Sequence, residues 1–166
     1  MNGLRDFWKP RRRVDRVVLV VTSVIALLVI AAGASGCGSA KKSDTKIAYV
    51  KVLPRKQTLQ QGVTTIITQR PNLTFVVGVR NAGNDLEQNV KVTLVIHQNP
   101  PSNSITRTLS IAKISNGATQ EVDFRGPFNL TTLISVVPID VRISPGPNET
   151  SLVDNTATYE VRFSLG

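Results

Sequence analysis

Residues 73–96 read LTFVVGVRNAGNDLEQNVKVTLVI, and this stretch decides the fold. Apolar side chains occupy every second position from Leu73 to Val79 and again from Val90 to Ile96. A period of two is typical of β-strands with one buried face. The segment Asn81–Asn84 between them (NAGN) consists of residues that favour turns. The stretch therefore predicts two half-buried strands joined by a turn.

The same alternation recurs along the rest of the chain. It covers residues 105–111, 121–125, 137–143 and 157–163, with turn residues at 99–102, 116–117 and 144–148. Residues 47–53 are predicted as a first strand, and 62–68 as a short edge or continuation strand. No helical period of useful length follows residue 40. About seven short strands in residues 47–166 predict an all-β domain, an immunoglobulin-like antiparallel β-sandwich.

A long apolar stretch precedes this domain. Residues 17–32 read VVLVVTSVIALLVIAA, and no charged residue occurs between Arg16 and Lys41. With the small residues that follow, a helix over 17–35 would be roughly 28 Å long, which is just enough to cross a bilayer core. The chain is therefore predicted to begin with one N-terminal transmembrane or signal helix at residues 17–35.

The flanks of this helix predict its orientation. The head, residues 1–16, carries six Lys or Arg against two Asp. Because positive flanks stay inside, the head is expected in the cytoplasm and the C-terminal domain outside, as a single-pass protein of the plasma membrane. Residues 36–46 are small, polar and charged, which predicts a flexible tether between helix and domain.

The end of the apolar stretch leaves a second kind of anchor open. Ala34-Ser35-Gly36-Cys37 resembles the lipobox of bacterial lipoproteins, in which small residues lead to a cysteine. It departs from that pattern at Ala34, where a Leu is the common residue. The resemblance implies cleavage before Cys37 and lipid attachment to it, which would make the chain a lipid-anchored cell-surface lipoprotein. Both anchors hold the domain outside the cytoplasm.

Several segments of the domain resemble the bacterial cell-adhesion-related domain, CARDB. Residues 73–83 and 89–96 resemble the V-x-V-x-N-x-G strand and turn of that family and its following x-N-V-x-V strand. Residues 115–124 resemble its glycine-containing turn into a Val/Phe strand, and 153–161 its closing D-N-N-x-A-x-x-x-V strand. The resemblance covers residues 60–166. It implies a non-catalytic, surface-displayed β-sandwich used for contact or spacing.

Few residues could carry chemistry. His97 is the only histidine and Cys37 the only cysteine, so neither a catalytic group nor a zinc site can be named. Calcium is the better metal candidate, because Asp85 and Glu87 lie in a loop that also contains several Asn. Calcium needs six to eight oxygen ligands, however, and Asn and Asp also serve turn geometry. Asp85 and Glu87 are therefore named as calcium candidates only, and no cofactor is expected.

Two further ligand classes are disfavoured. Carbohydrate sites present exposed aromatic rings, but residues 38–166 contain no Trp. Most of the other aromatic residues of the domain are expected to lie on inward faces, which leaves Phe128 as the exposed ring. They are Tyr49, Phe75, Phe124, Tyr159 and Phe163. Nucleic-acid binding is not expected, because the positive charge is dispersed and lacks stacking aromatics.

The sequence thus predicts a membrane-tethered, non-catalytic, extracytoplasmic β-sandwich that binds an envelope protein or a cell-wall polymer of a bacterium. The alternative is a small accessory subunit of a membrane complex, whose helix packs against neighbouring helices. Small residues mark such helix faces, and Ala26, Gly33 and Ala34 form a sparse version of one.

Overall fold

The computed structural model describes residues 42–147, 149 and 151–165. The predicted helix at 17–35 and the lipidation candidate Cys37 lie outside the described residues. Among the residues that are described, no helix is long and apolar enough to cross a membrane.

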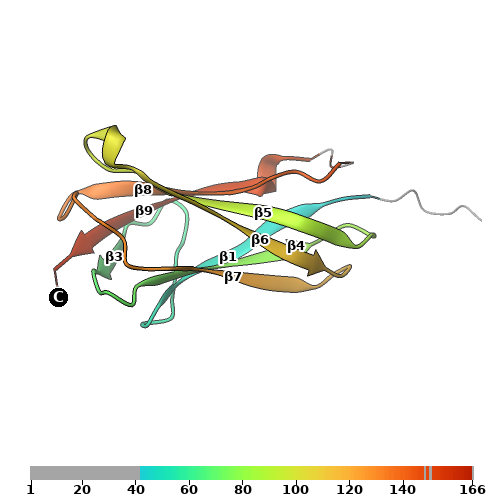
Figure 1. Ribbon diagram of the computed structural model, residues 1–166, viewed down its shortest axis with the longest axis horizontal. Helices are drawn as coiled ribbons and strands as arrows, with labels where there is room; N and C mark the ends of the chain where they lie inside the picture. The colour runs from blue at the N-terminus through green and yellow to red at the C-terminus, as the bar shows by residue number, and fades with distance from the viewer. Residues whose placement is uncertain (1–41, 148, 150, 166) are drawn as a thin grey trace, which may run out of the picture. The chain divides into compact units, whose positions relative to one another are not determined.

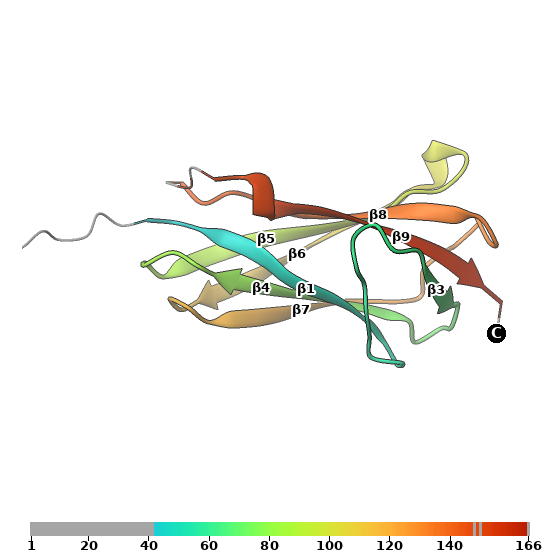
Figure 2. The same cartoon turned by 180° about the vertical axis from the view of Figure 1, so that it is seen from behind.

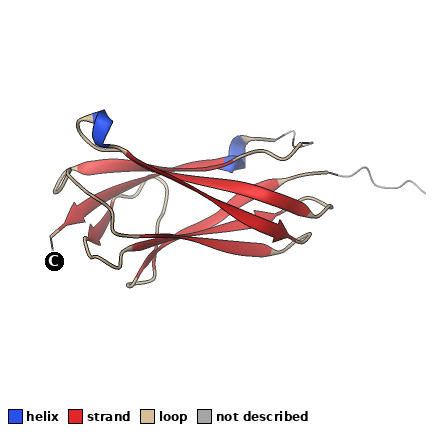
Figure 3. Ribbon diagram, viewed as in Figure 1, coloured by secondary structure: helices blue, strands red, loops and turns tan. Residues whose placement is uncertain are grey.

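The described residues form strands joined by loops and two single-turn 3-10 helices (Figure 3). The strands are β1 (Thr45–Leu53), β2 (Gln57–Thr58), β3 (Thr65–Thr68), β4 (Thr74–Asn81), β5 (Glu87–Ile96), β6 (Ile105–Ile114), β7 (Thr119–Arg125), β8 (Val136–Ile143) and β9 (Thr156–Ser164). The 3-10 helices are Pro101–Asn103 and Val153–Asn155. The all-β prediction is confirmed, although the described part has nine strands rather than about seven. Strand β3 lies within the short strand expected at 62–68, and the two-residue β2 has no counterpart among the predicted strands.

The strands form two sheets that pack face to face (Figures 1 and 2). One sheet has the order β2-β1-β4-β7, and the other has the order β3-β9-β8-β5-β6. Every pairing is antiparallel except that of β3 with β9, which is parallel. The prediction of a purely antiparallel sandwich is therefore wrong at this edge. After β2 the chain leaves the four-stranded sheet. It then forms β3, which joins the five-stranded sheet beside β9.

The core lies between the two sheets and follows the predicted alternation. The inward residues of β4 and β5 from Phe75 to Val79 and from Val90 to Ile96 are at most 6% exposed. The inward residues of β8 and β9, from Val137 to Ile143 and from Tyr159 to Phe163, complete the cluster. Burying such side chains contributes about 1.5–3 kcal/mol each, so these four strands supply most of the driving force for folding.

The folded part begins before the predicted start of the domain at residue 47. Strand β1 starts at Thr45, and residues assigned to a flexible tether are hydrogen-bonded to the β4–β5 turn. The N–H of Lys42 donates to Asn84 Oδ1 at 2.7 Å, and the carbonyl of Asp44 accepts from the N–H groups of Ala82 and Gly83. Within the predicted tether 36–46, the described residues 42–46 thus belong to the domain.

Candidate functional site

The turn after β4 is built around the buried side chain of Asn81, which is fully covered. Its Nδ2 donates to the carbonyl oxygens of Asp85 and Ile114, and its Oδ1 accepts from the N–H of Gly83. Gly83 is required for a different reason. A Cβ atom there would overlap the backbone of Lys42, which crosses directly over the turn. The N-x-G motif is thus structural, and it joins the start of the domain to both sheets.

The calcium candidates lie beside this turn. The Oδ1 of Asp85 accepts a hydrogen bond from the N–H of Leu86 at 2.9 Å, and Glu87 is buried at the start of β5. Within the described residues, no three His, Cys, Asp or Glu side chains gather in a way that could hold a metal ion. Calcium binding at Asp85 and Glu87 therefore stays a prediction. The described residues place no third acidic side chain beside these two.

His97 pairs with a carboxylate on the outer face of the second sheet. Its Nε2 lies 3.0 Å from Asp140 Oδ2, and the same carboxylate accepts hydrogen bonds from Arg142 and Thr158. Desolvation alone would raise the pKa of Asp140, but the hydrogen bonds from His97, Thr158 and Arg142 outweigh it and lower the pKa below its usual value. The hydroxyl of Thr158 donates to the Asp140 carboxylate and not to the imidazole, so His97 is not paired with a hydroxyl group in this cluster.

Tyr49 lies on the outer face of the first sheet and is an exception to the prediction that the aromatic residues lie mostly on inward faces. It is opposite Gly78 of β4, and a Cβ at Gly78 would overlap the ring. The ring lies across this gap, and its hydroxyl donates to Glu121 of β7. The Lys51 ammonium sits 4.0 Å from the ring centroid. Because its hydroxyl donates to the Glu121 carboxylate, the pKa of Tyr49 is raised and that of Glu121 is lowered.

Phe128 is buried, which corrects the prediction that it is an exposed ring. Only 5% of it is exposed, and it packs edge-to-face on Phe75 with ring centroids 5.4 Å apart. Arg107 of β6 covers the ring at 4.5 Å and donates to the backbone carbonyls of Arg125 and Pro127. Arg107 thereby links the edge strands of the two sheets. The aromatic platform that a sugar would need is therefore absent at this loop.

Solved structures share this arrangement of strands. The solution NMR structure of the CARDB domain of PF1109 from Pyrococcus furiosus is 15% identical and has a TM-score of 0.50, over 76% of this chain and 99% of that domain. The chain has the CARDB fold. The resemblance inferred from the strand and turn motifs is confirmed at this level, since the likeness is one of fold and not of close sequence.

Two further solved structures are similar. The crystal structure of the PF1109 CARDB domain in complex with di-metal ions is 14% identical over 74% of this chain and 89% of that chain, with a TM-score of 0.48. A solution NMR structure of residues 272–376 of a protein named as a cell surface protein from Methanosarcina acetivorans is 19% identical over 69% and 91%, also with a TM-score of 0.48. No family model matches the chain, and neither does any curated protein sequence.

Proposed function

We propose that this chain is a non-catalytic binding module of the bacterial envelope. In this proposal residues 17–35 hold it in the plasma membrane, or lipid on Cys37 does so. The CARDB-like sandwich is displayed outside the cytoplasm, where it contacts an envelope protein or a cell-wall polymer.

The observation that carries the proposal is the CARDB fold, directly after a sequence that predicts a membrane anchor. The geometry of the two outer faces supports a binding role. Asp140 and Glu121 each hold neighbouring side chains in place through hydrogen bonds, and in neither cluster does a hydroxyl group donate to a histidine. A rigid sandwich with a continuous core presents fixed surfaces, which is what a binding module needs.

The test is cross-linking of the tagged, full-length chain in its own cells, followed by mass spectrometry of the adducts from the membrane fraction. The expected result is an adduct with one dominant protein partner, or an adduct in which the chain is cross-linked to wall polymer. The matched control carries an unrelated transmembrane helix in place of residues 17–35. Partner contact that survives this exchange supports a module that acts through its sandwich.

Two outcomes would contradict the proposal. Adducts that vanish with the exchanged helix would indicate an accessory subunit that acts through its membrane segment. Recovery of nothing above background, from intact cells and with several cross-linker lengths, would exclude a stable contact of either kind. In the same sample, the mass of the N-terminal peptide distinguishes a lipidated Cys37 from an uncleaved helix.

A further inference from the structure

One corner of the sandwich collects exposed aliphatic side chains. Ile66 of β3 and Val136 of β8 are 51% and 49% exposed. Both are paired with Arg162 of β9, so the three residues form one row across the outer face of the sheet. Ile134 and Leu165, just before β8 and just after β9, are 75% and 71% exposed. Exposed aliphatic groups gathered in this way mark surfaces that bind a partner.

The backbone at Ile134 is strained. Its φ is 71°, in the left-handed region that β-branched residues rarely adopt. A backbone hydrogen bond from its N–H to Phe163 holds it beside the end of β9. Strain of this kind is energetically unfavourable and often accompanies a functional surface. Here it keeps an apolar side chain exposed at the corner.

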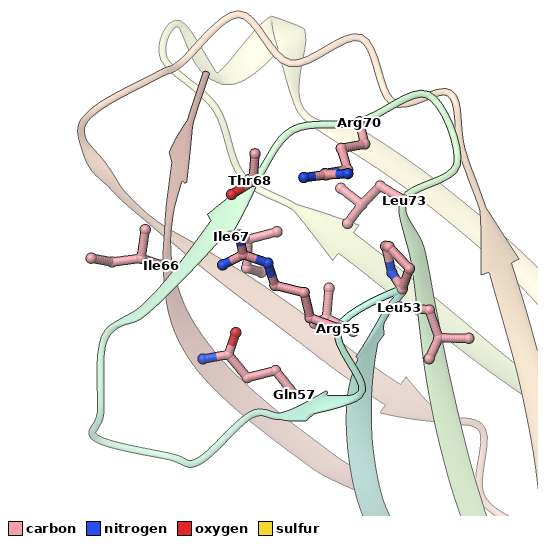
Figure 4. A pocket seen from close by; sticks show the side chains of 10 residues that line it. Leu53, Arg55, Gln57, Ile66, Ile67, Thr68, Arg70 and Leu73 are labelled. Atoms are coloured by element: carbon pink, nitrogen blue, oxygen red, sulfur yellow. The ribbon is translucent and has the colours of Figure 1, made fainter. Parts of the chain in front are cut away.

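A shallow cleft adjoins this row, between the β1–β2 turn and the free edge of β3. Its lining includes the buried side chains of Val52, Ile67 and Leu73. Arg55 reaches over it from the β1–β2 turn, and Arg70 reaches over it from the segment after β3 (Figure 4). The two guanidinium groups thus project into one apolar cleft from opposite sides.

No acidic residue lines this cleft. Within the described part of the chain, Arg55, Arg70 and Arg162 have no hydrogen bond or ion pair to their side chains. Other arginines are engaged, since Arg125 pairs with Asp123 and Arg142 with Asp140. Three positive charges that pair with no described residue, beside exposed aliphatic groups, are complementary to an acidic and apolar ligand.

We propose that this corner, defined by Arg55, Ile66, Arg70, Val136 and Arg162, binds an acidic segment of a partner polypeptide. Carboxylates of the segment pair with the arginines, and its aliphatic side chains cover the exposed row. The inference rests on the proposed function and names the partner's chemistry. A polypeptide is favoured over a lipid surface because the corner lacks the aromatic residues that sit at headgroup level.

The test uses the full-length chain in phosphatidylcholine nanodiscs and a fluorescent dodecapeptide of alternating Glu and Leu. A peptide with Gln in place of Glu is its control. Anisotropy should show saturable binding of the Glu peptide. Binding should be about tenfold weaker in the triple variant Arg55→Gln, Arg70→Gln, Arg162→Gln, because exposed ion pairs contribute little individually and three are lost together. The double variant Ile66→Ser, Val136→Ser should also weaken binding while all charges are kept.

The matched control removes three positive charges elsewhere, with Arg80→Gln, Lys91→Gln and Lys113→Gln. It should bind the Glu peptide within about twofold of the wild type, since dispersed surface charges contribute little. Equal weakening by both triple variants would overturn the proposal in favour of non-specific attraction. Binding of phosphatidylglycerol vesicles that needs the same arginines, with no binding of the Glu peptide, would overturn it in favour of a lipid surface.

Cross-linking in cells separates this inference from the proposed function. Loss of the partner adduct in the corner triple variant, with retention in the control variant, supports both. An adduct that persists in both variants would contradict the corner and leave the binding module standing. Absence of any adduct in the wild type would contradict the proposed function itself.

Discussion

The two ends of the sandwich are each organised by one buried carboxamide, and they differ in what that group holds. Asn81, where β4 turns into β5, donates two hydrogen bonds through its side-chain amide and accepts one. Gln98, just after β5, donates to the carbonyls of Asn103 and Asn129, and its Oε1 accepts from the N–H groups of Thr131 and Thr132. Gln98 therefore has more hydrogen bonds than Asn81.

The number of bonds is nevertheless a poor guide to their importance. Asn81 is 0% exposed and its bond to Ile114 is buried, whereas Gln98 is 6% exposed and its partners Asn103, Asn129 and Thr131 are exposed. Water can replace a lost hydrogen bond at an exposed carbonyl but not at a buried one. We infer that the Asn81 end fixes the sandwich, and that the Gln98 end orders loops.

Replacing Asn81 with Ala should have the largest effect. It removes the hydrogen bonds to the buried carbonyl of Ile114 and the half-buried carbonyl of Asp85, and it leaves the N–H of Gly83 with the Asp44 carbonyl as its acceptor. Each lost partner of a buried polar group costs about 1–3 kcal/mol. We expect a loss of about 3 kcal/mol or more in the free energy of unfolding by urea. Asn84→Ala, in the same turn but with an exposed side chain, is the matched control and should cost much less.

Replacing Gln98 with Ala should cost about 2 kcal/mol, because water can reach most of its partners. Urea unfolding measures the global effect. Amide hydrogen exchange should show faster exchange at Thr131 and Thr132 and little change at Asn81. A cost equal to or above that of Asn81→Ala would refute the distinction between the two ends.

Gly83→Ala refines the account of the first end. The added Cβ would overlap the backbone of Lys42, so residues 42–44 should leave the turn. We expect a cost of about 1 kcal/mol, since only a terminal segment is released while the Asn81 bonds remain. Trypsin should cleave at Lys42 sooner than in the wild type. Ala82→Ser, on the exposed side of the turn, should leave cleavage unchanged.

Asp140→Asn changes a residue in β8 that belongs to neither end of the sandwich. It should have the smallest effect at neutral pH, with a loss below about 1 kcal/mol in the free energy of unfolding. Because the folded pKa of Asp140 lies below its unfolded value of about 3.9, the ionised carboxylate stabilises the fold above that pH. This contribution is lost as pH falls through the folded pKa. Urea unfolding from pH 6 to pH 3 should show a shallower decline in Asp140→Asn. The Asn81 and Gln98 variants should keep the wild-type slope, since an amide does not titrate.

Much of the fold could be predicted from the sequence because burial of one strand face leaves a period of two. The inward positions of β4, β5, β8 and β9 were found in this way. The turn at Asn81 was also predictable, because two of its three partners lie within four residues. Gln98 gave no such signal, since most of its partners are 31–34 residues away.

The misplaced aromatic residues show where the reasoning fails. Alternation around the buried Val50 and Val52 places Tyr49 outward, but an aromatic ring was expected in the core. The sequence does not reveal that Gly78 lies opposite and leaves room for the ring. Phe128 follows a Gly-Pro loop and was expected to be exposed, because nothing in its own segment predicts the contact with Phe75. Likewise, Arg55 and Arg70 line the same cleft only because β3 joins the second sheet.

The central claim, that the sandwich is displayed outside the cytoplasm, is tested most directly by labelling intact cells. Ser110→Cys places a thiol on the exposed side of β6, and the wild-type chain, with Cys37 alone, is the control. A membrane-impermeant maleimide should label the variant in intact cells to the same extent as after lysis. Labelling that appears only after lysis would place the sandwich in the cytoplasm and contradict the account.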